Sequence, residues 1–290
     1  MKDLDFLQQI LCCPSCYGKL KKQESSLICL GCEQIFSIQN GVPVILNKES
    51  LCMLEAGKDQ VLPRNIGRLG SFLRKVLPQP LEHRWITSKE NKERAFHFLS
   101  KFNPSSLVLD LGSGIKRWSD NVVNLDIGAF ENVDIVGDGH KLPFCDEEFD
   151  GVISCVVLEH VNNPYKVTEE MHQFLKKGGQ IFVSFPFIYA FHSSTGTHQD
   201  FTRLTKYGLQ EIFFSFEKIE LRQEGVVSIS IISILSAYLV LLFTDRDVFY
   251  GGLQRFFGWL LFPLCLLDPI LAKRSKVHMI APSFFFIGRK

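Results

Sequence analysis

The stretch Leu107-Val108-Leu109-Asp110-Leu111-Gly112-Ser113-Gly114 decides the fold of this 290-residue chain. Four apolar residues around one aspartate are typical of a short buried strand, and the two glycines that follow mark a tight turn. Glycines at a strand-to-helix turn let the backbone approach a ligand closely. The pattern therefore predicts an α/β domain with a ligand-binding loop formed by Asp110, Gly112, Ser113 and Gly114.

Three more short strands follow, and two of them end in acidic residues. The strand predicted over 121–125 ends before Asp126, where a carboxylate is placed to accept hydrogen bonds from two ribose hydroxyls. The strand over 133–136 runs into Gly137-Asp138-Gly139, and a fourth covers 149–157. A dinucleotide fingerprint needs a third glycine where Arg117 stands, so NAD binding is disfavoured.

Over residues 105–225 this succession resembles class I S-adenosylmethionine-dependent methyltransferases. The resemblance implies a Rossmann-like seven-stranded sheet and S-adenosylmethionine as the cofactor. It also implies that the glycine loop holds the methionine part, that Asp126 binds the ribose, and that Asp138, with Gly139 beside it, lies against the adenine. Two features depart from the family: Lys116 replaces a frequent third glycine, and the interval after Gly114 is short for a first helix.

The rest of the α/β pattern continues to the end of the chain. Apolar spacing predicts a helix over 163–177, for which Gly178-Gly179 is a plausible C-cap. The further predicted elements are a fifth strand over 180–185, a helix over 204–214, and two antiparallel strands over 216–221 and 278–287.

Two cysteine pairs stand near the N-terminus: Cys13-Pro14-Ser15-Cys16 and Cys29-Leu30-Gly31-Cys32. Paired CxxC knuckles let four thiolates converge on one Zn²⁺, and a segment of about 40 residues needs such a metal because its core is small. The alternatives are accidental clustering or a redox pair, but a redox pair leaves the second CxxC unexplained. We therefore expect Cys13, Cys16, Cys29 and Cys32 to bind a structural Zn²⁺.

The chain starts without an export signal, so we expect a reducing compartment and interpret cysteines as ligands or core residues before disulfides. The run 11–46 resembles the small zinc ribbon that occurs alone as a methyltransferase activator or fused before methyltransferases. The predicted organisation is a zinc ribbon over 1–47, a helical linker over 48–104, and a methyltransferase domain over 105–290.

Candidate catalytic residues lie between the fifth strand and the next helix, on the carboxyl side of the sheet where open α/β folds bind ligands. His198 and Asp200 are placed to deprotonate a hydroxyl acceptor as it attacks the methyl group. The alternative is that both residues cap the following helix and hold the loop.

An apolar insertion occupies 226–271, between the last two predicted strands. Val226–Phe243 has no charge over 18 residues, and a second apolar run covers 256–267. Because both ends join one sheet, a single complete span is excluded, whereas a hairpin or helices lying on a membrane surface fit. A basic amphipathic pattern over 64–77 supports the same interpretation. The alternatives are an active-site lid and a dimer interface.

Composition limits the function classes. Lys and Arg number 32 against 31 Asp and Glu, which argues against a strongly basic nucleic-acid binder. The sequence favours a methyltransferase acting on a small amphipathic or membrane-linked acceptor, at oxygen, on the cytoplasmic face of a membrane. The alternatives are an rRNA or tRNA methyltransferase with a zinc module, and a catalytically degenerate scaffold of the same fold.

Overall fold

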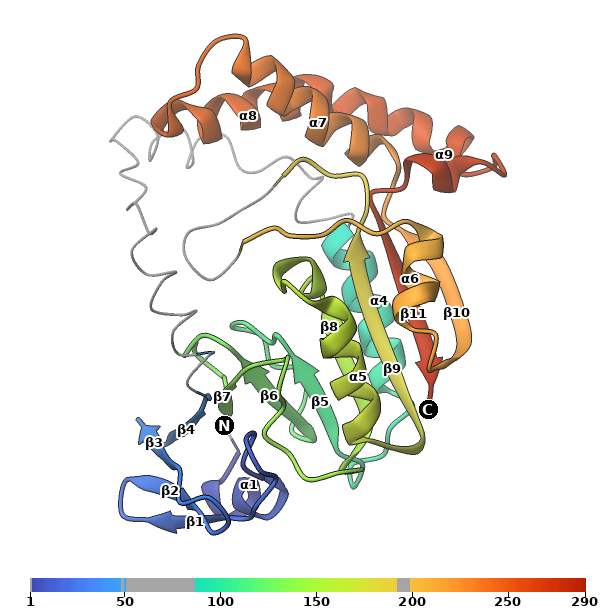
Figure 1. Cartoon of the computed structure of the whole chain (residues 1–290). Helices are drawn as coiled ribbons and strands as arrows, with labels where there is room; N and C mark the ends of the chain where they lie inside the picture. The colour runs from blue at the N-terminus through green and yellow to red at the C-terminus, as the bar shows by residue number, and fades with distance from the viewer. Residues whose placement is uncertain (1, 48–49, 51–86, 192–198) are drawn as a thin grey trace.

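Seven strands form the central sheet of the α/β domain, as predicted. The computed structural model describes residues 2–47, 50, 87–191 and 199–290 (Figure 1). The strand order is β7-β6-β5-β8-β9-β11-β10 within a longer sheet. The bounds are β5 (Val108–Leu111), β6 (Val122–Asp126), β7 (Ile135–Gly137), β8 (Phe149–Cys155), β9 (Leu175–Pro186), β10 (Glu217–Glu224) and β11 (Ser283–Arg289).

Burial explains which strands form the centre of the sheet. All residues of β5, β6 and β7 are buried, as expected for parallel strands covered on both faces. β11 runs antiparallel between β9 and β10, pairing Phe285 with Ser184 on one side and with Arg222 on the other. The last two strands therefore close the sheet in the predicted arrangement, but β11 begins at Ser283 rather than at 278, because Val277–Ile280 form a 3-10 turn.

Helices cover the two faces of the sheet. Helix α4 (Thr87–Leu99) packs Ala95 and Phe98 against one face. Helices α5 (Pro164–Phe174) and α6 (Lys206–Ile212) contribute to the core on the other. The predicted C-cap at Gly178-Gly179 is wrong: α5 ends at Phe174, Leu175 is its C-cap, and β9 begins there without a loop.

The N-terminal segment adds four strands to the sheet beside β7. It consists of α1 (Leu4–Ile10), β1 (Leu20–Gln23), β2 (Ser26–Cys29), β3 (Ile35–Gln39) and β4 (Val42–Ile45). Strand β4 pairs in parallel with β7, through Val44 with Val136 and Ile45 with Gly137. The buried Leu7 and Ile10 of α1 and Leu27 of β2 belong to the same hydrophobic core as α5.

The apolar insertion is helical. It contains α7 (Ser228–Leu241), α8 (Asp247–Leu261), the 3-10 segment η3 (Phe262–Leu267), α9 (Asp268–Leu271) and the 3-10 turn η4 (Val277–Ile280). The helical run Phe249–Leu271 spans 23 residues and contains an 18-residue window with a mean hydropathy of 1.2, so by length and composition alone it could cross a membrane. The helical structure begins before the second apolar run, at Asp247, and continues beyond its end to Leu271.

Two sequence expectations lie outside the described residues: the amphipathic pattern over 64–77 and the candidate base His198.

Candidate active site and zinc site

The four predicted zinc ligands form one cluster. Their sulfur atoms all lie within 4.8 Å of one another, with Cys13 Sγ 3.7 Å from Cys32 Sγ and Cys16 Sγ 3.4 Å from Cys29 Sγ. Thiolates bound to one zinc at about 2.3 Å in a tetrahedron lie about 3.8 Å apart, so the cluster fits a structural Zn²⁺.

The backbone around the cluster supports the same assignment. The amides of Gly31 and Cys32 donate to Cys29 Sγ at 3.3 and 3.5 Å, and the amide of Ser15 donates to Cys13 Sγ at 3.4 Å. A Cβ on Gly18 would lie 2.9 Å from Cys29 Sγ. Sequence reasoning missed Gly18, whose role follows only from this close approach.

Cys12 and Cys145 form a disulfide that joins the N-terminal segment to the α/β domain, with Cα atoms 5.3 Å apart. The expectation that cysteines are ligands or core residues before disulfides is wrong for this pair. The physical reason is the backbone bridge between Leu11 and Phe144, where the Cys12 amide donates to Pro143 O and the Cys145 amide to Ile10 O. This bridge holds the two residues within the Cα distance that a disulfide requires.

The glycine loop follows β5. Gly112 has a φ of +76°, and a Cβ there would lie 2.4 Å from Val157 Cγ2, so only glycine fits without strain. Gly114 also has positive φ (+55°), but a Cβ there would face open space. The side chain of Ser113 is buried, and its hydroxyl has no hydrogen-bond partner among the described residues.

Asp126 ends β6 beside this loop. Its Oδ2 accepts a hydrogen bond from the Gly114 amide at 2.8 Å, and its Oδ1 accepts one from the Gly128 amide at 2.9 Å. Each carboxylate oxygen keeps acceptor capacity for a further donor, because each has two lone pairs. The predicted ribose ligand is therefore fixed in place next to the glycine loop.

Asp110 is buried at the end of β5. Burial raises the pKa of Asp110 to about 7, although the nearby Lys116 ammonium acts in the opposite direction. A cationic group bound beside this side chain would stabilise the charged carboxylate.

Asp138, the predicted adenine neighbour, is held by two other residues. His140 donates its amide to Oδ1 at 2.9 Å and places Nδ1 2.7 Å from the same atom, while Ser50 Oγ donates to Oδ2 at 2.5 Å. Burial would raise the pKa of Asp138, but these hydrogen bonds outweigh burial and leave the pKa below its ordinary value. Gly139 follows, and a Cβ there would lie 3.5 Å from side-chain atoms of Leu111 and Val167. Sequence reasoning missed Ser50, which lies 88 residues away.

The loop after β9 contacts the residues that follow β8. The side chain of Asp200 is buried in an ion pair with Arg203. The amide of Phe201 donates to Glu159 O at 2.8 Å, and His160 Nδ1 lies 2.9 Å from Gln199 O. Asp200 thus stands beside the 3-10 turn η2 (Leu158–His160), at the carboxyl end of β8.

Glu159 of η2 is completely buried. Burial raises the pKa of its carboxyl group to about 8, with the Arg203 guanidinium acting in the opposite direction. The structure therefore brings Glu159 and Asp200 together around Arg203, a grouping the sequence did not reveal.

Comparison with known proteins agrees with this geometry. Residues 109–183 match a family model described as a methyltransferase domain, and residues 5–41 match one described as Trm112p-like protein. The chain contains an S-adenosylmethionine-dependent methyltransferase domain. A Trm112p-like segment with a zinc-binding cysteine cluster precedes it.

Parts of this chain are also similar to two further proteins in sequence and to one solved structure. A Methanocaldococcus jannaschii protein, the uncharacterized protein MJ1123, is 47% identical over 97 residues, covering 29% of this chain and 47% of that protein. A Methylobacillus flagellatus UPF0434 protein is 48% identical over 46 residues, which cover 15% of this chain and 77% of that protein. Haemonchus contortus phosphoethanolamine N-methyltransferase 2 in complex with S-adenosyl-L-methionine has 16% identity and a TM-score of 0.44, covering 81% of this chain and 60% of that one. The alignment spans about half the length of the first relative.

The methyltransferase domain has the features that its cofactor requires. The positive-φ turn at Gly112 and the open space at Gly114 allow close backbone approach, and the Ser113 hydroxyl is a buried polar group without a partner among the described residues. The acidic side chains of Asp110 and Asp126 lie on either side of this turn, at the ends of adjacent strands. These residues fit S-adenosylmethionine, which carries an ammonium group and ribose hydroxyls.

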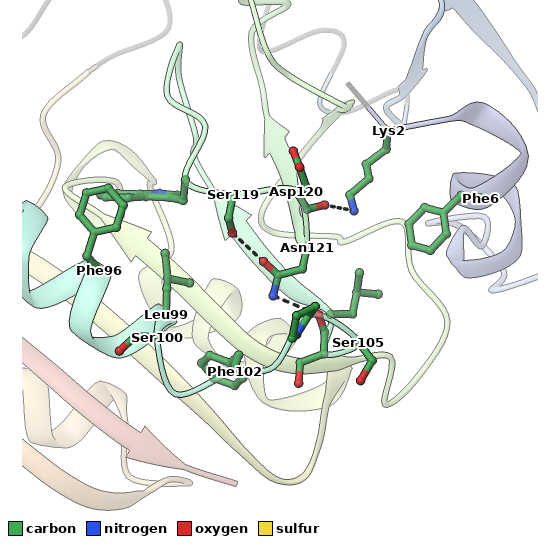
Figure 2. Close-up of a pocket in the computed structure, with 14 residues that line it drawn as sticks. Lys2, Phe6, Phe96, Leu99, Ser100, Phe102, Ser105, Ser119, Asp120 and Asn121 are labelled. Carbon is green, nitrogen blue, oxygen red and sulfur yellow. Dashed lines mark hydrogen bonds between the residues drawn. The ribbon is translucent and has the colours of Figure 1, made fainter.

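A pocket of about 570 Å³ lies elsewhere on the methyltransferase domain (Figure 2). It is lined by Phe96, Phe102 and Trp118, and Asn121 in its wall donates to Ser106 O at 3.3 Å. These residues precede β5 and β6 or belong to α4, so the pocket lies toward the amino ends of the strands. It contains none of the predicted cofactor residues.

Proposed function

We propose that this methyltransferase acts on a small amphipathic or membrane-linked acceptor, and that the acceptor atom is oxygen. The observation that carries the proposal is the position of the apolar helices. The Ala190 amide, in the loop after β9, donates to Ser233 Oγ of α7 at 3.1 Å. The apolar helices therefore rest on the loop that follows the fifth strand, where the acceptor site is expected.

A second set of contacts fixes the same loop to the two residues that join η4 to β11. The amide of Phe187 donates to Pro282 O at 2.8 Å, and that of Ile188 donates to Ala281 O at 3.2 Å. Phe191 and Phe201, on either side of the undescribed part of the loop, are 75% and 51% exposed. An acceptor with an apolar part would find apolar side chains on both sides of this loop.

Methyl transfer requires little from protein side chains beyond alignment of the acceptor with the methyl group. Bound S-adenosylmethionine supplies a methyl group already activated by a sulfonium, whose electron pair stays on sulfur when the carbon bonds to the acceptor oxygen. The acceptor hydroxyl must lose its proton, and His198 and Asp200 are the proposed proton acceptors. Arg203 holds Asp200 in position through the ion pair.

Untargeted mass spectrometry of lipids and metabolites tests this proposal. Cells lacking the gene should accumulate a compound lighter by 14 mass units than its normal form, the mass of one CH₂, and the compound should partition with the lipid fraction. Unchanged lipids together with an unmethylated position in rRNA or tRNA would contradict the proposed acceptor. Absence of S-adenosylhomocysteine binding in calorimetry would contradict the enzyme itself and support a scaffold.

A further inference from the structure

The helical insertion carries an exposed apolar surface. Among the residues that the structure describes, 27 large hydrophobic side chains are exposed, and 14 of them lie between Ile231 and Ile280. Single exposed apolar residues are normal, but a concentration of this kind marks an interaction site. We call the exposed apolar residues of 231–280 the apolar surface.

Helix α7 has two different sides. Its exposed apolar residues recur at intervals of three or four, which places them on one side of the helix: Ile231, Ile234, Tyr238 and Leu241. Its serines are buried and contact the protein, where Ser230 Oγ donates to Ile280 O at 2.8 Å and Ser228 Oγ to Leu264 O at 3.0 Å. The serines of α7 therefore face inward, and the outer side of the helix is apolar.

The second helical run continues the apolar surface. Phe249, Phe256 and Leu260 of α8 are each at least 45% exposed, and their spacing of seven and four residues places them on one side of that helix. Leu267 of η3 is 50% exposed. Only 17% of the most apolar 18-residue window in Phe249–Leu271 is buried. Figure 1 shows α7 and α8 side by side along the end of the molecule toward which β9 points.

A basic group stands at the end of this surface. Lys273, Arg274 and Lys276 are exposed, and no acidic residue occurs from 273 to 282. Apolar side chains next to a basic group complement a bilayer that contains anionic lipids, because the chains enter the interface while the cations contact headgroups. We propose that the apolar surface docks onto the face of an anionic lipid bilayer.

The positions of the two ends of the insertion show whether its helices can cross a bilayer or must lie on its surface. The insertion leaves the sheet at Glu224 and returns at Ser283, and these two residues are cross-strand partners. A crossing by Phe249–Leu271 would require α7 to cross back. Helix α7 has 14 residues and a length of about 21 Å, which is shorter than the hydrocarbon core of about 30 Å. The helices therefore lie in the plane of the interface.

Docking on a bilayer would make the bilayer the source of the acceptor. This part of the inference rests on the proposed function. The side of α7 opposite the bilayer holds the loop after β9 through Ser233. An acceptor embedded in the bilayer would reach the methyltransferase site from the docked side. Docking itself needs neither cofactor nor methyl transfer, so it is measured separately.

Flotation of the full-length protein with vesicles tests the proposal. The protein should float with vesicles of phosphatidylcholine containing about 30% phosphatidylserine, a composition that supplies anionic headgroups, and should float less with phosphatidylcholine alone. The double variant Leu242→Glu with Leu266→Glu changes side chains that are 62% and 76% exposed, so folding should be kept while binding falls at least tenfold. Replacing Lys273, Arg274 and Lys276 by Gln should weaken binding to anionic vesicles about 100-fold, near fivefold for each charge.

A matched control changes equally exposed residues outside the insertion. Tyr207→Glu with Phe214→Glu, at 78% and 76% exposed, should float like the unchanged protein. Equal flotation of the two double variants, or no flotation of the unchanged protein, would overturn the proposal. So would a concentration-dependent dimer in light scattering that only the Leu242 and Leu266 changes dissociate, since the surface would then bind a second copy. Normal S-adenosylhomocysteine binding alongside failed flotation would reject docking and leave the proposed enzyme intact.

Discussion

The amide nitrogen of Gly114 lies 2.8 Å from Oδ2 of Asp126, so the turn after β5 is tied directly to the end of β6. The Gly128 amide binds the other oxygen of the same carboxylate at 2.9 Å. One buried side chain therefore orders two loops at the predicted cofactor site. Asp126→Ala should weaken S-adenosylhomocysteine binding at least tenfold in calorimetry. It should also lower the free energy of unfolding by about 1–3 kcal/mol, because two amides lose their acceptor. Asp120→Ala, an exposed change beyond the opposite end of β6, should do neither.

The open space at Gly114 gives a test of ligand approach with a built-in control. Gly114 and Gly178 both have positive φ, and a Cβ at either position would meet nothing within 4 Å. Alanine at each position should therefore cost a similar amount of stability, about 1 kcal/mol. Only Gly114→Ala should weaken cofactor binding, because only its methyl group would stand where the ligand approaches. Equal affinities of the two variants would remove Gly114 from the cofactor site.

The raised pKa of Asp110 predicts that Asp110→Asn raises the stability of the protein above neutral pH, whereas the same change weakens S-adenosylhomocysteine binding. The folded chain keeps Asp110 protonated up to a pKa of about 7, whereas the ordinary value is 3.8. Since the folded state binds the extra proton, the contribution of Asp110 to the free energy of unfolding falls as pH rises from about 4 to 7 and stays low above 7. Asp110→Asn removes this dependence.

Two measurements on Asp110→Asn check whether the carboxyl group of Asp110 lowers stability and supports cofactor binding. Thermal unfolding at about pH 8 without ligand should give a higher Tm for Asp110→Asn than for the unchanged protein, and the difference should shrink toward about pH 5. Calorimetry at neutral pH should show weaker S-adenosylhomocysteine binding by the same variant. A variant that loses both stability and affinity would show that Asp110 is structural.

Adjacent cysteines should respond differently to substitution. Cys13 belongs to the four-sulfur cluster, whereas Cys12 is in the disulfide with Cys145. Cys13→Ser should abolish zinc in metal analysis of the purified protein, because three thiolates hold a structural ion poorly. Cys12→Ser should keep one zinc per chain. Zinc loss in both variants would mean that Cys12 is also a ligand.

The disulfide closes a long loop, with a sequence separation of 133 residues between its cysteines. Restricting the unfolded chain in this way stabilises the folded state by about 2–5 kcal/mol. A phosphine reductant should therefore lower the Tm of the unchanged protein and leave that of Cys145→Ser unaffected. An unchanged Tm after reduction, with the reduction itself confirmed by a mass gain of two hydrogen atoms, would contradict the stabilising role.

The sequence predicted the elements of the sheet because their signals are local. Leu107 to Leu111 shows a buried strand in its own composition, and so do the later strands of the α/β domain apart from β10, which is charged and largely exposed. The paired cysteine knuckles are equally local, so the zinc cluster was found with all four ligands. The cofactor residues were chosen from the glycine turn and from acidic residues at strand ends.

Contacts between distant segments could not be predicted in this way. Ser50 reaches Asp138 across 88 residues, and nothing around Ser50 in sequence points to a carboxylate. The disulfide depends on the bridge between Leu11 and Phe144, which only the packed structure creates. The false C-cap at Gly178 arose because two glycines after an amphipathic helix resemble a helix end, whereas here the chain enters β9 first.

Transfer of radiolabelled methyl from S-adenosylmethionine to a membrane lipid extract shows directly whether this protein methylates a membrane-linked acceptor. We expect the purified protein to label a compound in the lipid fraction, Gly178→Ala to do so equally, and Gly114→Ala to do so at least tenfold more slowly. Label in RNA or in water-soluble compounds alone, or no transfer by a protein that binds S-adenosylhomocysteine, would contradict the proposed function.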